Sequence, residues 1–382
     1  MTRASDAERE RLHDTFAALC RVLSPSGHER SCTDHVAREL AGMGLEVDED
    51  DAGPSAGADA GNLFARIPGR GRGSIMLCAH LDTVPPTAPI QPILIDGGWT
   101  NAADGIIGAD NKAAVAVMLE LANRLVGAKE RADVGVELLF TVSEENGLHG
   151  AKAFDVSRLN SKFGFAFDHA TPIGEIVIAS PTYQRIVAEL HGRAAHAGIR
   201  PEEGRSAIAS AAAAIASMRL GRLDPETTAN VGTIAGGTAT NVVPERCRVE
   251  AEVRGLTDQR VEEVVTEMID LFQDAADAAE CDLDLTVERM FTAYRTKPAA
   301  PQVELAQRAL RTCGYEPKLI VTGGGSDANA FEAAGFPCTN LANGTERNHE
   351  PGERVSVDAL EGMLEVAIAL VEQADTDWEG TP

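Results

Sequence analysis

The sequence predicts an α/β fold with a mostly parallel, mixed sheet, interrupted by a second and smaller α+β domain. Two continuous apolar runs of strand length, residues 74–79 and 134–142, flank a helical pattern at 112–125. Buried strands that alternate with helices are typical of a parallel sheet covered on both faces. In such sheets ligands bind at the carboxyl ends of the strands, and polar side chains follow both of these runs.

The remaining elements of the first domain follow from helical periodicity and turn residues. A charged amphipathic helix is expected at 6–23, then a turn at Ser24-Pro-Ser-Gly27, then a helix ending near residue 43. Small and acidic residues at 51–61 predict a surface loop. The α/β pattern resumes late in the chain with a helix at 302–313, strands at 318–322 and 337–341, and a closing helix at 357–373.

Between these parts the pattern changes to alternating strands. The expected order is a strand at 185–191, an Ala-rich helix at 206–218, strands at 229–234 and 246–253, a helix at 260–279 and a strand at 282–289. Strand, helix, strand, strand, helix, strand is the ferredoxin-like order. We therefore expect an inserted domain at 181–294 and a discontinuous first domain formed by 1–180 and 295–382.

Composition limits the function. A chain of 382 residues favours two domains over one core. Its 34 basic and 59 acidic residues give a net charge of −25, with no Lys/Arg-rich run, so neither nucleic acid nor an anionic membrane is an expected partner. Seven scattered cysteines without a C-x-x-C pair, and no apolar segment long enough for a signal peptide or a membrane span, predict a cytoplasmic protein.

His80 and Asp82 stand two residues apart at the end of the first apolar strand. Side chains at this spacing on an extended strand leave on the same face. The Asp82 carboxylate would then accept a hydrogen bond from the imidazole nitrogen that does not bind a metal. An ordinary His and Asp at a strand exit fit the isolated pattern equally well.

Three further acidic residues could serve a metal centre. Asp110 comes after Gly108 at the start of a helix, where Asp is a favoured N-cap, although a carboxylate in this crevice can also bridge two cations. Glu144 and Glu145 follow the second strand, and on an extended backbone they would point in opposite directions. One could bind a metal while the other acts as a general base. A solvated acidic pair is the alternative.

Asp168 ends the apolar run 163–167, and His349 lies in a polar loop after the last strand. Each alone fits a structural role. Together with the residues above, they supply imidazole and carboxylate ligands suited to zinc, or to manganese or cobalt in its place.

The order of these motifs closely resembles the co-catalytic zinc peptidases that include peptidase T, carboxypeptidase G and the aminoacylases. The resemblance covers nearly the whole chain. The motifs are His80-Leu-Asp-Thr-Val-Pro85, Gly108-Ala-Asp-Asn-Lys112, Ser143-Glu-Glu145, Gly192-Arg-Ala-Ala-His-Ala-Gly198, Gly236-Gly-Thr-Ala-Thr-Asn-Val-Val-Pro244 and Asn348-His-Glu-Pro-Gly-Glu353.

The resemblance implies a catalytic domain with two zinc ions per subunit and an inserted lid or dimerisation domain. It implies that Asp110 bridges the ions, that His80 and Asp168 complete one site, and that Glu145 and His349 complete the other. Two acidic side chains would assist, with Asp82 orienting His80 and Glu144 acting as the general base.

The resemblance also implies functional residues outside the metal ligands. His196 would assist the developing oxyanion, often from the partner subunit of a homodimer, and Asn241 and Arg254 would hold substrate. A turn histidine, a turn asparagine and a strand-end arginine are the structural alternatives. Gly324 and Gly325 would let the backbone approach the substrate, because the run at 323–327 lacks the Gly-Lys ending of a phosphate loop.

We therefore expect a peptidase T-like enzyme that cleaves amide bonds of short peptides. Asp at position 168 favours aminopeptidase and dipeptidase relatives, since carboxypeptidase and deacylase relatives often have Glu there. A carboxypeptidase or an N-acyl-amino-acid deacylase is the alternative. A non-catalytic metal- or peptide-binding protein is a remote one, because it would be expected to lack a ligand or the base.

Overall fold

The computed structural model describes residues 3–374. The chain divides into two compact units. The first comprises the chain up to Ile178, the segment Arg295–Thr322 and the chain from Ser326 onward. The second comprises Ala179–Tyr294 together with Gly323–Gly325. The three glycines thus group with the second unit, although the sequence-based ranges assigned them to the first. Residues 1–2 and 375–382 of those ranges lie outside the described residues.

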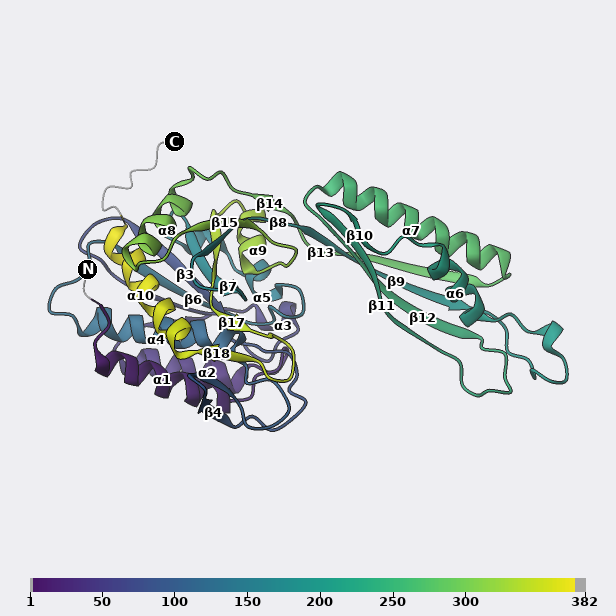
Figure 1. The fold of residues 1–382 in the computed structure, drawn as a ribbon, viewed down its shortest axis with the longest axis horizontal. Helices are drawn as coiled ribbons and strands as arrows, with labels where there is room; N and C mark the ends of the chain where they lie inside the picture. The colour runs from purple at the N-terminus through teal and green to yellow at the C-terminus, as the bar shows by residue number, and fades with distance from the viewer. Residues whose placement is uncertain (1–2, 375–382) are drawn as a thin grey trace. The chain divides into compact units, whose positions relative to one another are not determined.

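The first unit is built on a nine-stranded mixed sheet (Figure 1). Its central strands β6, β3, β7 and β16 run parallel to one another, and β2 and β8 flank them in antiparallel pairs. The path of the sheet is β1 (Val47–Glu49), β2 (Leu63–Ile67), β6 (Gly135–Thr141), β3 (Ser74–His80), β7 (Gly164–His169), β16 (Cys338–Ala342), β8 (Glu175–Ser180) and β14 (Tyr294–Arg295), and β15 (Lys318–Val321) pairs with β8.

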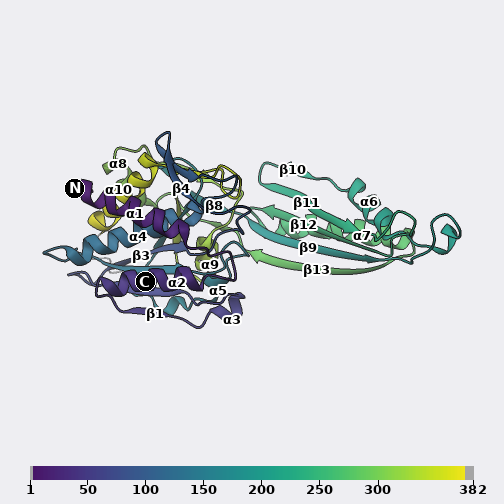
Figure 2. The same cartoon turned by 90° about the horizontal axis from the view of Figure 1, so that it is seen from below.

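Helices cover this sheet, and α4 (Ala109–Gly127) is the most deeply buried of them. It packs against β3 and against α1 and α10, and in Figure 2 the sheet around β3 lies between α4 and α5. The predicted mixed α/β architecture is confirmed. The other helices of the unit are α1 (Asp6–Arg21), α2 (Arg30–Gly42), α3 (Gly53–Ala56), α5 (His149–Ala153), α8 (Pro301–Thr312), α9 (Asp327–Ala333) and α10 (Val357–Gln373).

A separate four-stranded sheet was not predicted. It consists of β17 (Thr345–Glu346), β18 (Arg354–Ser356), β5 (Gly98–Asn101) and β4 (Pro92–Ile95). Strands of two to four residues carry too little periodicity to be recognised in a sequence. The sheet anchors both ends of the segment between β17 and β18, and this segment carries His349. The loop expected at 51–61 also contains the short helix α3.

The second unit is a five-stranded antiparallel sheet with two long helices against it, and its core joins apolar residues of both layers. Its order β10-β11-β12-β9-β13 contains the ferredoxin-like arrangement plus the short strand β10, which the sequence analysis missed. The elements are β9 (Thr182–His191), α6 (Ala207–Ser217), β10 (Gly221–Asp224), β11 (Thr227–Gly236), β12 (Arg246–Gly255), α7 (Asp258–Ala278) and β13 (Asp282–Phe291).

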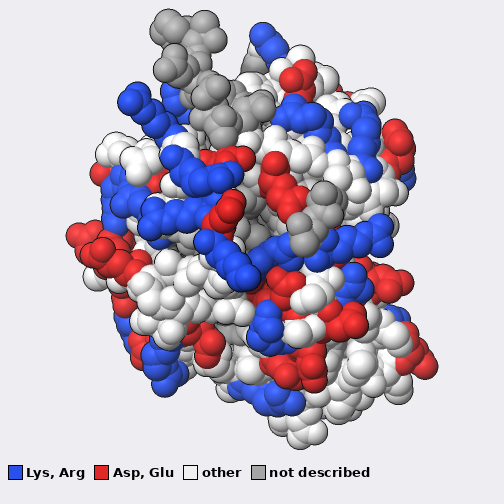
Figure 3. Space-filling model, turned by 90° about the vertical axis from the view of Figure 1, so that its left-hand side faces the viewer, with Lys and Arg blue, Asp and Glu red and all other residues white. Residues whose placement is uncertain are grey.

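The surface carries charges of both signs. On the face drawn in Figure 3, Lys and Arg side chains lie beside Asp and Glu side chains. Among the described residues, no helix combines the length and the apolar character needed to cross a bilayer.

Candidate metal centre

The predicted site residues of the first unit converge at the carboxyl ends of neighbouring parallel strands. His80 is the last residue of β3, Glu144 and Glu145 follow β6, and Asp168 lies near the end of β7. Parallel strands bring their carboxyl ends to one edge, so residues far apart in the sequence meet there. Asp110 joins them from the start of α4, and His349 joins them from the segment between β17 and β18.

Asp110 faces two groups of ligands with its two oxygens. Its Oδ1 lies 3.3 Å from His80 Nε2, and that nitrogen lies 3.6 Å from Asp168 Oδ1. Its Oδ2 lies 3.3 Å from His349 Nε2, which in turn lies 2.9 Å from Glu145 Oε1. His80 and Asp168 form one group with Asp110, and His349 and Glu145 form the other. In each group the possible ligand atoms lie close enough together to surround one cation.

The backbone around Asp110 differs from the expectation of a capping residue. The N-cap of α4 is Gly108, whose φ of 79° is left-handed and suits glycine. Asp110 itself has non-helical angles, φ −84° and ψ 106°. Its carboxylate therefore turns away from the helix end and toward the imidazoles.

Asp82 has a different partner from the one expected. His80 Nδ1 lies 3.0 Å from the carbonyl oxygen of Asp82 and 3.5 Å from its carboxylate, so the main-chain oxygen is the nearer acceptor. Because a carbonyl oxygen can only accept, Nδ1 carries the proton and Nε2 faces Asp110. The main chain of Asp82 thus holds the ring, whereas the sequence analysis assigned this role to its carboxylate.

The Asp82 carboxylate instead holds the loop after β6. Its Oδ1 accepts from the Glu144 amide at 3.0 Å, and its Oδ2 accepts from the Glu145 amide at 3.1 Å and from Ser26 Oγ at 2.6 Å. The chain leaves the extended conformation at Ser143, where φ is 54°. The prediction that the two glutamates diverge was therefore wrong.

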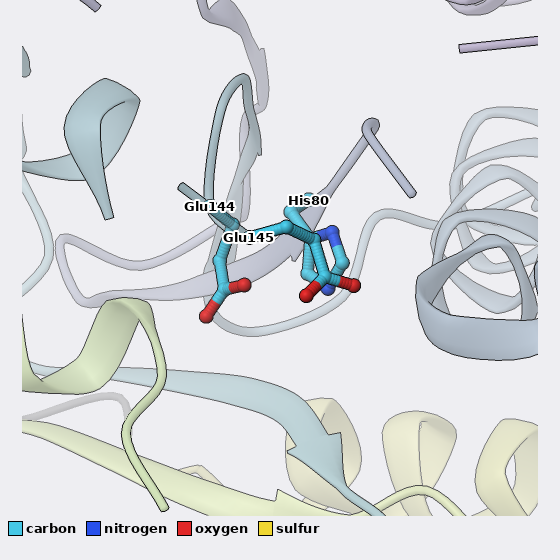
Figure 4. A group of neighbouring side chains, drawn as sticks. All are labelled: His80, Glu144 and Glu145. Carbon is cyan, nitrogen blue, oxygen red and sulfur yellow. The ribbon is translucent and has the colours of Figure 1, made fainter. Parts of the chain in front are cut away.

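Glu144 and Glu145 lie on the same side of the loop, next to His80 (Figure 4). One oxygen from each carboxylate and one ring nitrogen of His80 lie within 4.8 Å of one another. Glu145 also contacts His349, whereas no hydrogen bond or ion pair to the Glu144 carboxylate is found among the described residues. Glu144 thus reaches the centre while its carboxylate stays available.

The electrostatics reflect this concentration of negative charge. Burial, followed by the charge of Asp110, raises the pKa of Asp168 to about 8. Burial, followed by the charge of Asp168, also raises the pKa of Glu144 well above its usual range. For Asp110, burial is outweighed by hydrogen bonds from His349 and His80, which lower its pKa.

The two imidazoles respond in the opposite sense. Hydrogen bonds to Asp110 and Glu145 raise the pKa of His349 to about 10. Burial opposes the charged form of His80, but hydrogen bonds to Asp110, Asp168 and Asp82 raise its pKa well above normal. Both shifts have the same cause, which is the group of carboxylates that surrounds the two imidazoles.

The residues fit a pair of divalent cations. Among the described residues, Asp110 Oδ1 is buried and has the His80 imidazole 3.3 Å away, but no hydrogen bond of good geometry reaches it, which leaves lone pairs for another partner. Imidazole nitrogen and carboxylate oxygen together suit zinc, manganese and cobalt. Cations held here would supply the positive charge that the imidazoles otherwise provide as protons.

Sequence reasoning missed three buried side chains that support this centre. Asn340 holds the backbone of Asp168, accepting from its amide at 3.0 Å and donating to its carbonyl oxygen at 3.1 Å. Glu29 accepts from the Ser143 amide at 3.2 Å. Asp327 binds Thr141 and lies 3.7 Å from Cys78 Sγ. None of them stands at a recognisable spacing from a ligand, so no signal in the sequence identified them.

The second unit places its predicted residues at two ends of β12. His196 pairs with Val242, and the Ala197 amide donates to the Asn241 carbonyl oxygen, so His196 and Asn241 are neighbours beyond the start of β12. Arg254 lies eight residues into β12, which is about 26 Å along a strand. Within a single second unit, Arg254 therefore lies far from His196 and Asn241.

Arg254 is held in place by its own neighbours. Its guanidinium donates to Glu252 and to the carbonyl oxygen of Gly323, and it lies 4.4 Å from the ring centroid of Tyr183. Gly324 accepts a hydrogen bond from Ser180 Oγ through its carbonyl oxygen at 2.8 Å. A side chain at Gly325 would meet the Phe291 ring at 2.3 Å, so close packing explains this glycine.

Two family models match the chain. The peptidase dimerisation domain matches residues 183–280, which lie in the second unit. Peptidase family M28 matches residues 62–199, a range that contains all the proposed ligands except His349.

Curated relatives and solved structures extend the match over nearly the whole chain. Uncharacterized protein YqjE of Bacillus subtilis is 36% identical over 96% of this chain and 98% of its own length. A probable carboxypeptidase of Paracoccidioides brasiliensis is 32% identical over 74% of this chain and 71% of its own length.

Two crystal structures are similar in both fold and sequence. Aminopeptidase PepT of Bacillus cereus superposes with a TM-score of 0.83 and 38% identity, covering 95% of this chain and 98% of its own. A tripeptidase of Staphylococcus aureus gives a TM-score of 0.88 and 32% identity with the same coverage.

Removing divalent cations should destabilise the first unit, because the buried carboxylates would then repel one another. Chelator treatment should lower the midpoint of thermal unfolding, and Zn²⁺ or Mn²⁺ at about 100 times its Kd should restore about 2.7 kcal/mol per site. Calorimetry with parallel metal analysis measures both effects. Asp110→Asn should show a smaller response to added metal. An unchanged midpoint after complete metal removal would contradict the assignment.

Proposed function

Since the chain belongs to the family of co-catalytic metallopeptidases that includes peptidase T, carboxypeptidase G and the aminoacylases, we propose that it trims short peptides with a free amino end. The observation that carries the proposal is Asp110, which directs its two oxygens at two separate His–carboxylate pairs while Glu144 stands free beside them. An enzyme of this class needs two cations close together and one base that binds neither.

His80, Asp168 and Asp110 would hold one cation, and Asp110, Glu145 and His349 would hold the other, with zinc as the proposed metal. Two cations bound there supply Lewis-acid polarisation of the scissile carbonyl and acidify an attacking water. Side chains of the protein must carry out the proton transfers. This requires a base close to both groups of proposed ligands.

Glu144 is suited to that task. It would accept the proton of the attacking water as the carbonyl carbon is attacked, and then deliver the same proton to the leaving amine. Burial and the nearby Asp168 charge raise its pKa, so it holds a proton more readily than an exposed carboxylate. The Asp82 carboxylate accepts a hydrogen bond from the Glu144 amide and so keeps the Glu144 backbone in place during both proton transfers.

Glu144→Ala should lower kcat by about 10²–10⁴-fold while the enzyme keeps two metal ions. The variant loses the proton carrier but keeps every proposed metal ligand. Steady-state kinetics and metal analysis on the same preparation test this. Glu46→Ala, at an exposed position, serves as the control and should behave as wild type. Near-wild-type turnover by metal-replete Glu144→Ala would sink the mechanism.

The substrate class rests on Asp168 and on the relatives. Aminopeptidase PepT supports removal of residues from the amino end, and the tripeptidase supports short peptides as substrates. The probable carboxypeptidases support the alternative of cleavage at the carboxyl end. Hydrolysis of N-acyl amino acids, as in the deacylases of the same family, is a second alternative.

A panel of free-amine tripeptides, their N-acetylated forms and N-acyl amino acids separates these activities. We expect kcat/KM for free-amine tripeptides to exceed that for the acetylated peptides, and mass spectrometry of products should show loss of the amino-terminal residue. Release of the carboxyl-terminal residue would assign a carboxypeptidase. Preference for N-acyl amino acids would assign a deacylase.

We also propose that the second unit forms a homodimer and that His196 and Asn241 act on a partner's substrate. His196 and Asn241 lie together at the far end of β12 from Arg254, so the unit presents two separate groups. The edge of β11 is exposed from Thr233 to Gly236 and offers unpaired backbone for another chain. The match to a peptidase dimerisation domain supports this assembly.

Mixing two inactive variants tests whether His196 acts across the dimer. If it does, a heterodimer of Glu144→Ala and His196→Ala chains contains one site with both lesions and one with neither. Activity should therefore reappear after subunit exchange. If His196 acts within its own chain, every site keeps one lesion and the mixture stays inactive. Each variant alone, carried through the same exchange, is the control.

A further inference from the structure

A buried carboxylate outside the ligand set holds the backbone that leads to Asp110. Glu353 ends the segment between β17 and β18 and is 1% exposed. Its Oε2 accepts from the amides of Ile107 at 2.9 Å and Gly108 at 2.7 Å, and its Oε1 accepts from the amide of Asp110 at 3.0 Å. Both oxygens are thus committed to main-chain donors.

These donors stand where α4 begins. The first amides of a helix have no partner within it, and here Gly108 and Asp110 supply no side-chain cap of their own. Glu353 takes the place of a cap from a distant part of the chain. Because Asp110 has non-helical angles, the helical hydrogen-bond pattern does not by itself fix its backbone.

The same segment also holds the Asp110 side chain. Asn348 Nδ2 donates to Asp110 Oδ2 at 2.8 Å, and His349 Nε2 lies 3.3 Å from that oxygen. One segment of six residues, 348–353, therefore forms hydrogen bonds with both the amide and the carboxylate of Asp110. A rotation of Asp110 would break contacts at both ends.

We propose that Glu353 is a positioning residue that sets the orientation of Asp110, so that both oxygens face their separate ligand groups. The inference rests on the proposed bridging role of Asp110. It assigns Glu353 no contact with substrate or metal. Its effect reaches the centre through the backbone of residues 107–110.

Glu353→Gln is the sharpest single change. It keeps the shape of the side chain but replaces one acceptor oxygen by an NH₂ group, which would face main-chain donors. Asp110 should then lose its fixed orientation. Loss of a partner that orients a ligand lowers metal affinity or activity by about 10–100-fold.

The experiment titrates metal-free full-length chain with Mn²⁺ by calorimetry and follows exchange coupling between two Mn²⁺ ions by electron paramagnetic resonance. For Glu353→Gln we expect weaker Mn²⁺ binding, a reduced coupled signal and a kcat about 10–100-fold lower, with KM changed by less than about threefold. A role limited to stability would lower the unfolding midpoint and leave the coupled signal intact.

Glu350→Gln is the matched control. Glu350 lies in the same segment, is exposed and forms an ion pair with Arg347 at 3.6 Å. It should keep wild-type Mn²⁺ affinity, coupling and kcat. Wild-type values for folded Glu353→Gln would overturn the proposal. If Glu353→Gln does not fold, Glu353→Asp decides, because it keeps both acceptors on a shorter arm and should show a weaker coupled signal; an unaltered signal would overturn the proposal.

Asp110→Asn separates this inference from the proposed function. If Asp110→Asn retains two ions and full turnover, the bridging role of Asp110 fails, and with it the proposed arrangement of the centre. If Asp110→Asn loses them while Glu353→Gln does not, only the positioning role of Glu353 fails.

Discussion

Repulsion among buried carboxylates is the constraint on which the centre of this protein depends. Asp110, Asp168, Glu144 and Glu145 are brought together by the ends of β6 and β7 and the start of α4, where all four are buried or partly buried. Desolvated like charges so close together are costly, and the raised pKa values of Asp168 and Glu144 express that cost. A pair of bound cations would neutralise this repulsion, and the same carboxylates would then bind the cations tightly.

Rigid support makes this arrangement usable. The backbone of four proposed ligands or bases is held by a buried side chain from another part of the chain: Asn340 for Asp168, Asp82 for Glu144 and Glu145, and Glu353 for Asp110. Such hydrogen bonds satisfy amides that would otherwise be buried without partners. They also fix the ligands before any cation arrives, which reduces the reorganisation that binding would require.

The sequence predicted the elements whose pattern is long and local. The closing helix was expected at 357–373 and observed as Val357–Gln373, and the strands that became β3 and β6 were found within one residue at each end. The strands β4, β5, β17 and β18 escaped because short strands owe their existence to partners far along the chain.

The site was predictable to the same degree and for the same reason. Spacing and resemblance identified which residues meet, but the clamp of Asp82 on two amides depends on the turn at Ser143, and the placement of Arg254 at the opposite end of β12 from Asn241 depends on strand direction. Both are properties of three-dimensional structure that no local pattern encodes.

The burial of α4 has a consequence for how this chain can vary. Its buried run extends from Ala109 to Ala122, and Lys112 is fully enclosed there, donating to the carbonyl oxygen of Val22. A helix packed on every side cannot shift to accommodate a larger residue. An added methyl group near the middle of α4 would therefore need room that its packed neighbours do not leave, and any shift of the helix to make that room would also move Asp110 in its first turn.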